Sequence, residues 1–163
     1  MRKIGVLSDT HLNNVDDDLK SLFVSGPFRE VDTIIHAGDF TSVEVVNFLD
    51  SYMFYGVQGN MDDYQVREKL PDRRIETLDG VRIGIAHGWG APFGLDQRVY
   101  EYFGDPSLQC IVFGHSHKPT NHYIGETLMF NPGSFKKSFI SLRRTVGLLT
   151  IEKGKIRGEI ITL

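Results

Sequence analysis

Five short apolar runs in this chain each end in a motif that contains aspartate, asparagine or histidine. The motifs are Asp9-Thr10-His11, Gly38-Asp39, Gly59-Asn60-Met61-Asp62, His87-Gly88 and Gly114-His115-Ser116-His117. Segments with helical spacing lie between several of the runs, so strand and helix alternate through the first two-thirds of the chain. This alternation predicts a parallel sheet flanked by helices.

The apolar runs and the amphipathic segments set the expected boundaries of the elements. We expect strands at residues 2–7, 33–37, 53–57 and 110–113, and helices at residues 16–24 and 94–103. The stretch Thr41-Ser42-Val43-Glu44 has the spacing of a capping box, in which the first and fourth residues satisfy free backbone amides. It predicts a further helix that continues to Leu49.

Two glycine turns indicate antiparallel pairing later in the chain. Asp79-Gly80 separates residues 75–78 from 81–86, and Lys153-Gly154 separates residues 145–152 from 155–161. Two-residue loops of this kind are a strong hairpin signal. We therefore expect a second, more antiparallel sheet packed on the first, within a single domain that covers residues 1–163. The fold class is α/β, with two packed sheets flanked by helices.

Composition excludes several classes of protein. No apolar run approaches the ~20 residues that a membrane-spanning helix needs, and the short apolar N-terminus lacks the cleavage pattern of a signal peptide. The single cysteine, Cys110, allows no intrachain disulfide, which agrees with a reducing compartment. We expect a cytoplasmic protein with no membrane partner.

The charge of the chain is unevenly distributed. The net charge is −3, but residues 118–163 carry 8 Lys and Arg against 3 Asp and Glu. This basic segment is either a solvated strand face or a feature that attracts an anionic substrate. It gives no firm evidence for nucleic-acid binding, which would require a broad basic track.

The polar residues of the five motifs stand at the downstream ends of the expected strands. The carboxyl ends of parallel strands form the edge where ligands bind, so motifs far apart in sequence should converge there. Glycines at positions 38, 59, 88 and 114 suit tight turns close to a ligand. Two Asp, one Asn and four His at such an edge can hold two metal ions, a grouping used to hydrolyse phosphate esters.

The ordered series of motifs, followed by Asn131-Pro132-Gly133-Ser134, resembles the calcineurin-like metallophosphoesterases. More narrowly, it resembles the small single-domain phosphodiesterases of that superfamily, whose relatives include the retromer scaffold subunit. The likeness runs from residue 1 to residue 163, and Gly114-His115-Ser116-His117-Lys118-Pro119 is a particularly specific stretch. The fold that the resemblance implies is a four-layer α/β/β/α sandwich.

The resemblance also implies the ligands of a dinuclear metal centre. They are Asp9, His11 and His117 for one ion, Asn60, His87 and His115 for the second, and Asp39 as the bridge. Catalytic roles fall to Asp39, Asn60 and His115. Imidazole and carboxylate ligands suit Mn²⁺, our first choice, or Fe, Co, Ni or Zn. A hydroxide bridging two ions would attack a small or nucleotide-like phosphodiester in line, since metal binding lowers the pKa of water to about 7.

Several positions depart from the pattern of the superfamily or stay open. Met61 stands where many members place a proton-donating His. Because Met cannot protonate a leaving group, we expect the site to prefer diesters, or monoesters with good leaving groups. Trp89 follows His-Gly where close relatives often carry a further His. It is either a stacking surface for a substrate ring, so that Asn60 and Trp89 both bind substrate, or an ordinary core or rim aromatic. Asp62 either orients Asn60 or starts a helix. The place of the Lys136-Lys137 segment relative to the substrate stays open.

Two histidines are left out of the ligand set. His36 is expected inside a strand as a packed, hydrogen-bonded side chain, and His122 in a surface loop. The competing functions are a non-catalytic interaction scaffold of the same fold and a phosphomonoesterase. The expected partner is a small-molecule phosphodiester. A homo-oligomer stays open, and exposed aromatics such as Phe139 are candidates for its interface.

Overall fold

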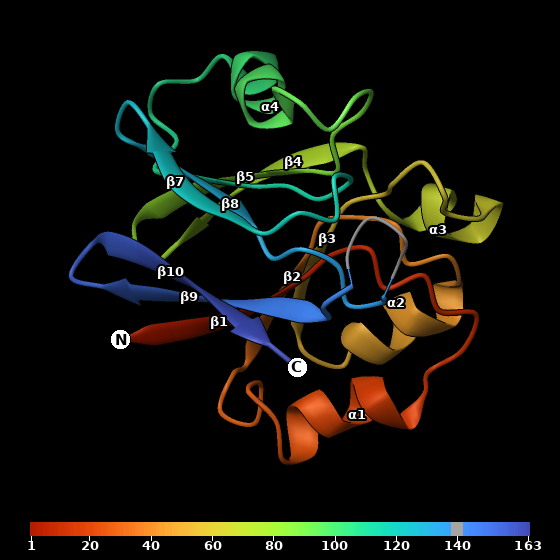
Figure 1. Ribbon diagram of the computed structural model, residues 1–163. Coiled ribbons are helices and arrows are strands. Elements are labelled where there is room, and N and C mark those ends of the chain that lie inside the picture. The colour runs from red at the N-terminus through yellow and green to blue at the C-terminus, as the bar shows by residue number, and fades with distance from the viewer. Residues whose placement is uncertain (138–141) are drawn as a thin grey trace.

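Two five-stranded β-sheets face each other, and helices cover both outer sides (Figure 1). The computed structural model describes residues 1–137 and 142–163, so Phe139 lies outside the described residues. The predicted architecture of two packed sheets flanked by helices is confirmed. No helix among the described residues is long and apolar enough to cross a membrane.

The first sheet has the strand order β10-β9-β1-β2-β3. Its strands are β1 (Arg2–Leu7), β2 (Thr33–His36), β3 (Met53–Gly56), β9 (Thr145–Glu152) and β10 (Lys155–Thr162). β1, β2 and β3 run parallel, and the hairpin β9–β10 pairs antiparallel with the other edge of β1. Two residues with positive φ, Lys153 and Gly154, form the hairpin turn as predicted.

The second sheet has the strand order β4-β5-β6-β8-β7. Its strands are β4 (Arg73–Leu78), β5 (Val81–Ala86), β6 (Cys110–Val112), β7 (Thr120–Ile124) and β8 (Thr127–Asn131). β5, β6 and β8 run parallel in the centre, and the edge strands β4 and β7 pair antiparallel. The turn between β4 and β5 is at Asp79-Gly80, as predicted.

The expected division into one parallel and one antiparallel sheet is wrong, because both sheets are mixed. β6 belongs to the second sheet, where β5 and β8 flank it and all three of its residues are buried. The β9–β10 hairpin joins the first sheet, because β2 and β3 extend that sheet on one side only and leave the other edge of β1 open. Alternation of strands and helices specifies the elements, but it does not specify which sheet each strand joins.

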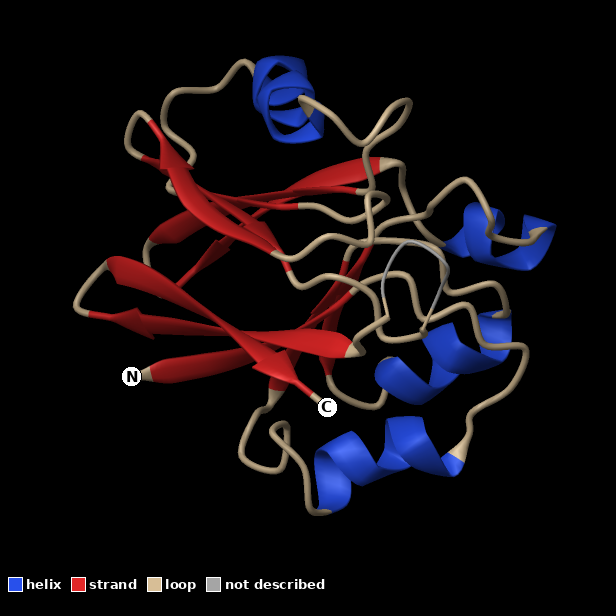
Figure 2. Ribbon diagram, in the orientation of Figure 1, coloured by secondary structure: helices blue, strands red, loops and turns tan. Residues whose placement is uncertain are grey.

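The described part of the chain has four helices: α1 (Asp17–Val24), α2 (Val43–Leu49), α3 (Tyr64–Lys69) and α4 (Leu95–Phe103). α1 and α2 lie on the outer side of the first sheet, α4 lies on the outer side of the second, and α3 lies at the rim (Figure 2). The N-cap of α2 is Ser42, which accepts a hydrogen bond from the amide of Glu44. The N-cap is therefore Ser42 and not Thr41, which has a φ of 80° and forms a β-bridge with Leu12. The predicted capping box is wrong, because the third residue after Ser42 is Val45, which cannot return a side-chain hydrogen bond.

Three apolar layers hold the sandwich together. The layer between the sheets includes Val6 and Ile35 from one sheet and Ile85, Val112 and Phe130 from the other. A second layer lies between the first sheet and the helices α1 and α2, and a third lies between the second sheet and α4. Burying apolar side chains on both faces of each sheet contributes roughly 1.5–3 kcal/mol per large side chain, which fixes the strand ends on which the site depends.

Three elements were not predicted from the sequence: α3, β7 and β8. α3 has six residues and buries only Val66, so it has almost no apolar periodicity. β7 is an exposed or half-buried edge strand, and the sequence gives it no alternating pattern. His122 therefore lies on β7, not in a loop; it is exposed, and its Nε2 is 3.0 Å from Oδ2 of Asp96.

Candidate metal centre

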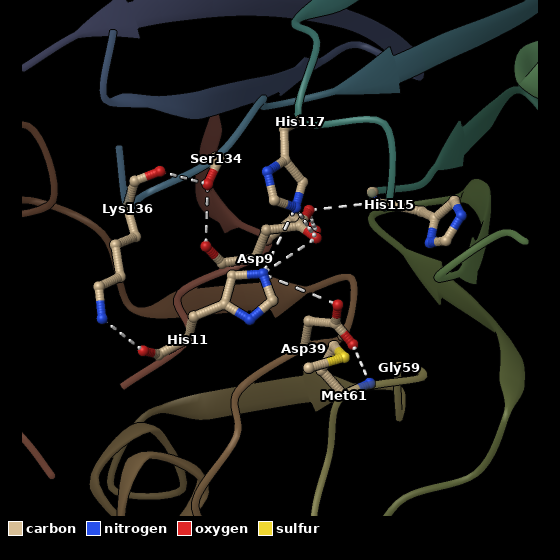
Figure 3. A network of polar contacts seen from close by, with 12 residues as sticks. Asp9, His11, Asp39, Gly59, Met61, His115, His117, Ser134 and Lys136 are labelled. Carbon is tan, nitrogen blue, oxygen red and sulfur yellow. Dashed lines mark hydrogen bonds and ion pairs between the residues drawn. The ribbon is translucent and has the colours of Figure 1, made fainter. Parts of the chain in front are cut away.

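The loops that follow β1, β2, β3, β5 and β6 meet at one edge of the sandwich, and they carry all seven predicted ligands. Figure 3 shows five of them: Asp9, His11, Asp39, His115 and His117. The first sheet supplies Asp9, His11, Asp39 and Asn60, and the second supplies His87, His115 and His117. The side chains form a continuous series of contacts, described below in two groups.

The first group consists of Asp9, His11 and His117. Oδ1 of Asp9 lies 3.1 Å from Nε2 of His117 and 3.8 Å from Nε2 of His11. The two imidazole nitrogens are 3.4 Å apart. Three ligand atoms this close surround a space that a single ion can fill. This is the trio expected for one metal ion.

The second group consists of Asp9, Asp39 and His87. Oδ2 of Asp39 lies 3.3 Å from Nε2 of His87 and 3.8 Å from Nε2 of His11. The Asp39 carboxylate therefore stands between the two groups, where the sequence places the bridge. Oδ1 of Asp9 also lies 4.0 Å from Nε2 of His87, so Asp9 is within reach of both groups.

Asn60 and His115 extend the second group. Oδ1 of Asn60 lies 3.2 Å from Nε2 of His87 and 3.0 Å from Nδ1 of His115. Nε2 of His115 lies 3.0 Å from the carbonyl of Gly90, which leaves Nδ1 facing Asn60. Similarly, Nδ1 of His87 lies 2.6 Å from the carbonyl of Ala37, so that Nε2 faces the site. A carbonyl behind each imidazole is the arrangement that orients metal-binding histidines.

Five of the seven predicted ligands have left-handed backbone conformations. The φ values are 52° at Asp9, 47° at His11, 60° at Asp39, 66° at His115 and 56° at His117. Such conformations cost about 1–3 kcal/mol each for residues other than glycine and cluster at functional sites. They also turn the chain sharply past the strand ends, which brings the side chains of an i,i+2 pair to the same centre.

The buried carboxylate of Asp9 supplies an independent test of whether the residues fit a cation. Its Oδ2 accepts hydrogen bonds from the Ser8 hydroxyl and the His115 amide. Its Oδ1 is buried and has no hydrogen-bond partner among the described residues, although Nε2 of His117 lies 3.1 Å away. A buried carboxylate oxygen is costly to leave unsatisfied, and an ion between it and the imidazoles would satisfy it.

Protonation in the metal-free site follows the close contacts between carboxylates and imidazoles. Burial opposes the charged form of His87, but the neighbouring Asp39 and Asp9 outweigh it and raise the pKa of His87 to about 9. Asp9 also raises the pKa of His117. Burial would raise the pKa of Asp39, but the hydrogen bonds from His87 and Met61 more than offset it and hold that pKa low. Burial lowers the pKa of His11.

Asp62 has a role that sequence reasoning missed. It neither contacts Asn60 by a side-chain hydrogen bond nor starts α3, whose N-cap is Asp63. Its buried carboxylate accepts hydrogen bonds from three backbone amides, those of Asp39, Thr41 and Gly59. Asp62 thus joins the loop after β2 to the loop after β3.

The motif Asn131-Pro132-Gly133-Ser134 forms hydrogen bonds to the backbone of the ligand loops. Nδ2 of Asn131 donates to the carbonyl of Gly114, and Oγ of Ser134 lies 3.1 Å from the carbonyl of Asp9. Lys136 follows two residues later, and its Nζ donates to the backbone carbonyl of His11 (Figure 3). Lys136 and Lys137 are both exposed, and the ammonium group of Lys136 lies at the backbone of His11.

His36 stays out of the ligand set, as predicted. It is fully buried and stacks on Phe40 with ring centroids 3.6 Å apart. Its Nδ1 accepts from the amide of Gly38, and its Nε2 lies 3.1 Å from the hydroxyl of Thr10. Burial holds the pKa of His36 well below 6.5, so the ring is neutral.

Trp89 lies at the entrance of a pocket next to the centre. The pocket has a volume of about 460 Å³. Asn60 and His87 line it on the side of the centre, and Trp89 and Tyr102 line it farther out. Trp89 is 45% exposed and packs edge-on against Tyr102.

A family model described as the calcineurin-like phosphoesterase superfamily domain matches residues 2–154. The chain belongs to this superfamily. A probable metallophosphoesterase from Methanothermobacter thermautotrophicus is 32% identical over 160 residues, covering 97% of this chain and 91% of the relative. The phosphodiesterase MJ0936 from Methanocaldococcus jannaschii is 27% identical over 169 residues, covering 95% of this chain and 96% of the relative.

Solved structures of the calcineurin-like phosphoesterase fold superpose on the whole chain. The Thermotoga maritima protein TM1076 is 32% identical, with a TM-score of 0.71 and complete coverage of both chains. Vacuolar Protein Sorting 29 from Cryptosporidium parvum is 17% identical, with a TM-score of 0.71, 99% coverage of this chain and 97% of that one. The second likeness concerns the fold alone. Membership of the superfamily supports a phosphoester hydrolase, and the two groups of candidate ligands suit a metal-dependent one.

Proposed function

We propose that this protein is a dinuclear metal-dependent phosphodiesterase that hydrolyses small or nucleotide-like phosphodiesters. The observation that carries the proposal is the position of the Asp39 carboxylate, with Oδ2 within 3.8 Å of His11 on one side and 3.3 Å of His87 on the other. A full-length relative that is named a phosphodiesterase supports the choice of reaction.

Hydrogen bonds from outside the ligand set orient Asp9, Asp39, His87 and His115. Oδ1 of Asp39 accepts the amide of Met61 at 2.8 Å, so Oδ2 is the atom free to face both ions. Asp39 would bridge the two ions through its carboxylate. Asp9, His11 and His117 would hold one ion. Asn60, His87 and His115 would hold the other, with the Ala37 and Gly90 carbonyls fixing the imidazoles of His87 and His115.

The ions, when bound, lower the pKa of a water molecule and offset the charge of the phosphate. The residues of the chain orient the substrate around them: Asn60 offers its side-chain amide, and Lys136 adds a positive charge beside His11. Met61 has no proton to donate to a leaving group. The site consequently favours diesters, or monoesters whose leaving group departs without protonation.

Imidazole, carboxylate and amide ligands together suit Mn²⁺, which we propose as the resident ion, and also Fe, Co, Ni and Zn. The cytoplasmic location and the single domain of residues 1–163 stay predictions, and a homo-oligomer stays open.

Assays with a chromogenic aryl phosphodiester test the proposal. We expect turnover with Mn²⁺, its loss with a chelator, and its abolition in Asp39→Asn, because the amide cannot supply a charged bridge. His122→Ala, at an exposed histidine on β7, is the matched control and should retain turnover. Alkyl phosphomonoesters cleaved much faster than aryl diesters would instead indicate a phosphomonoesterase.

The alternative is a non-catalytic scaffold, which the shared fold with Vacuolar Protein Sorting 29 allows. A scaffold needs no bridging carboxylate and no oriented imidazoles. Absence of turnover with every divalent ion tested, together with unchanged partner binding in Asp39→Asn, would establish the scaffold and reject the enzyme.

A further inference from the structure

The pocket beside the candidate metal centre is continuous with it. Asn60 and His87 line the pocket and also belong to the second group of ligands. A group bonded to a phosphate at these residues therefore enters the pocket directly. The volume of about 460 Å³ falls within the ~300–1,000 Å³ that is usual for small-molecule sites.

Two partly exposed aromatic rings form the outer wall of the pocket. Trp89 is 45% exposed and Tyr102 is 37% exposed. Their ring centroids are 5.0 Å apart with an interplanar angle of 75°. Both rings line the pocket and stay partly exposed, so a planar ligand in the pocket can contact them.

The aromatic wall is held in place by neighbouring arginines. Arg98 of α4 donates from Nε to the carbonyl of Trp89 at 3.2 Å. The guanidinium of Arg73 lies 4.5 Å from the centre of the Tyr102 ring. Rings that are already ordered lose little conformational entropy when a ligand binds, so stacking on them contributes most of its energy to affinity.

A carboxylate completes the wall. Asp72 lines the pocket, and the hydroxyl of Tyr102 lies 3.4 Å from its Oδ2. Asp72 can accept hydrogen bonds from the amino or ring N–H groups of a heterocycle. An alkyl group offers neither a face to stack nor such a donor.

We infer that this pocket binds an aromatic, nucleobase-like ring of the substrate, which makes Trp89 and Tyr102 specificity-determining residues. The inference rests on the proposed phosphodiesterase function and narrows its substrates to nucleotide-type esters. The ring stacks on the aromatic wall while the phosphate lies at Asn60 and His87.

The first test measures binding without catalysis. Trp89 is the only tryptophan of the chain, so tryptophan emission, excited selectively over the six tyrosines, reports on this pocket. Adenosine 5′-monophosphate and ribose 5-phosphate, which differ in the ring, are titrated with and without Zn²⁺. We expect the ring-bearing ligand to change the emission and to bind at least about fivefold more tightly, the size of a stacking contribution. Equal affinities with unchanged emission would overturn the inference.

The second test compares two diesters that share one leaving group, phenyl p-nitrophenyl phosphate and methyl p-nitrophenyl phosphate. In Trp89→Leu and Tyr102→Leu, we expect the preference in kcat/KM for the phenyl ester to fall roughly five- to tenfold, mainly through KM. Phe93→Leu is the matched control, since Phe93 lies on the same loop, is 89% exposed and does not line the pocket. A preference that stays unchanged in all three variants rejects the aromatic subsite.

Failure of the subsite and failure of the proposed function give different results. Metal-dependent hydrolysis with an unchanged phenyl preference removes the subsite and leaves the phosphodiesterase. Ring-dependent fluorescence changes without hydrolysis of any diester remove the phosphodiesterase and leave a nucleotide-binding pocket.

Discussion

At the scale of single residues, close packing leaves the ligands little freedom. Gly59 lies against Asp39, and a Cβ added to Gly59 would lie 2.2 Å from Oδ1 and 2.4 Å from the backbone nitrogen of Asp39. Gly114 similarly lies against Ser8 and Asp9. The absence of a side chain at Gly59 and Gly114 lets Asp39 and Asp9 pack directly against the backbone, and neither glycine has a left-handed conformation. The sequence predicted glycines close to the ligands at these positions.

Gly59→Ala should therefore displace Asp39. We expect the free energy of unfolding to fall by about 1–3 kcal/mol, typical of overpacking, together with a loss of metal affinity measured by calorimetry. Gly80→Ala is the control: it lies in the β4–β5 turn with nothing near its Cβ, so only its φ of 80° costs stability. Equal metal affinity in the two variants would contradict the proposed role of Asp39.

The raised pKa of His87 predicts a pH dependence of metal binding. Nε2 must be deprotonated to bind an ion, and below a pKa of about 9 it carries a proton in the metal-free protein. Binding at neutral pH should release at least about one proton, and affinity should fall as pH is lowered. Calorimetry in buffers of different ionisation enthalpy measures the release. A heat of binding that is independent of the buffer would argue against His87 as a ligand.

The raised pKa of His87 also makes the stability of the metal-free protein depend on pH, in the opposite direction to metal affinity. A folded-state pKa raised above 6.5 stabilises the fold fully at pH below 6.5, and this stabilisation is lost as pH rises through about 9. In the metal-free protein, the contribution of the contact between His87 and Asp39 to the free energy of unfolding should therefore fall as pH rises through about 9.

At the scale of elements, side-chain hydrogen bonds tie the ligand-bearing loops to each other and to the short helices. Asp62 connects the loops after β2 and β3, and Arg67 of α3 donates to the carbonyls of Asn60 and Asp62. Arg98 of α4 does the same for the loop that carries Trp89. The short helices thus position the site through side chains that bind loop carbonyls.

Asp62→Ala should destabilise the site because it leaves three backbone amides without their acceptor. We expect a loss of about 3 kcal/mol in the free energy of unfolding by urea denaturation, since each unsatisfied buried group costs roughly 1–3 kcal/mol. Asp62→Asn keeps one acceptor oxygen, so its free energy of unfolding should lie between those of the wild type and of Asp62→Ala. Asp63→Ala, which removes the N-cap of α3, should cost only about 1 kcal/mol. A smaller loss for Asp62→Ala than for Asp63→Ala would show that the loops are held by other contacts.

At the scale of the whole molecule, the sequence predicted the elements and the site better than the arrangement of strands. Asp9, Asp39 and His87 could be placed together because each follows an apolar strand at a carboxyl end. The strands β6 and β9 were assigned to the wrong sheets, since either sheet could bury their apolar faces. The role of Asp62 was missed because its partners are backbone amides, which no side-chain pattern reveals.

Metal binding should stabilise the whole fold. An ion that binds only the folded state at about 100 times its Kd adds roughly 2.7 kcal/mol, which corresponds to about 5–10 °C in Tm for a chain of this size. Calorimetric scans with Mn²⁺ and with chelator measure the difference. His122→Ala should show the same shift, and Asp39→Asn a smaller one. An identical Tm with and without Mn²⁺ would mean that no ion binds under those conditions.

The ligands come from both sheets, with Asp9 and Asp39 on one and His87 and His117 on the other. An ion held among them would be coordinated from both sheets at once, at the edge of the apolar layer between them. Opening motions that part the layers must then release the ion first. Amide hydrogen exchange at the adjoining ends of β1 and β5 should slow together when the ion binds, so occupancy of the centre would govern how often the sandwich opens.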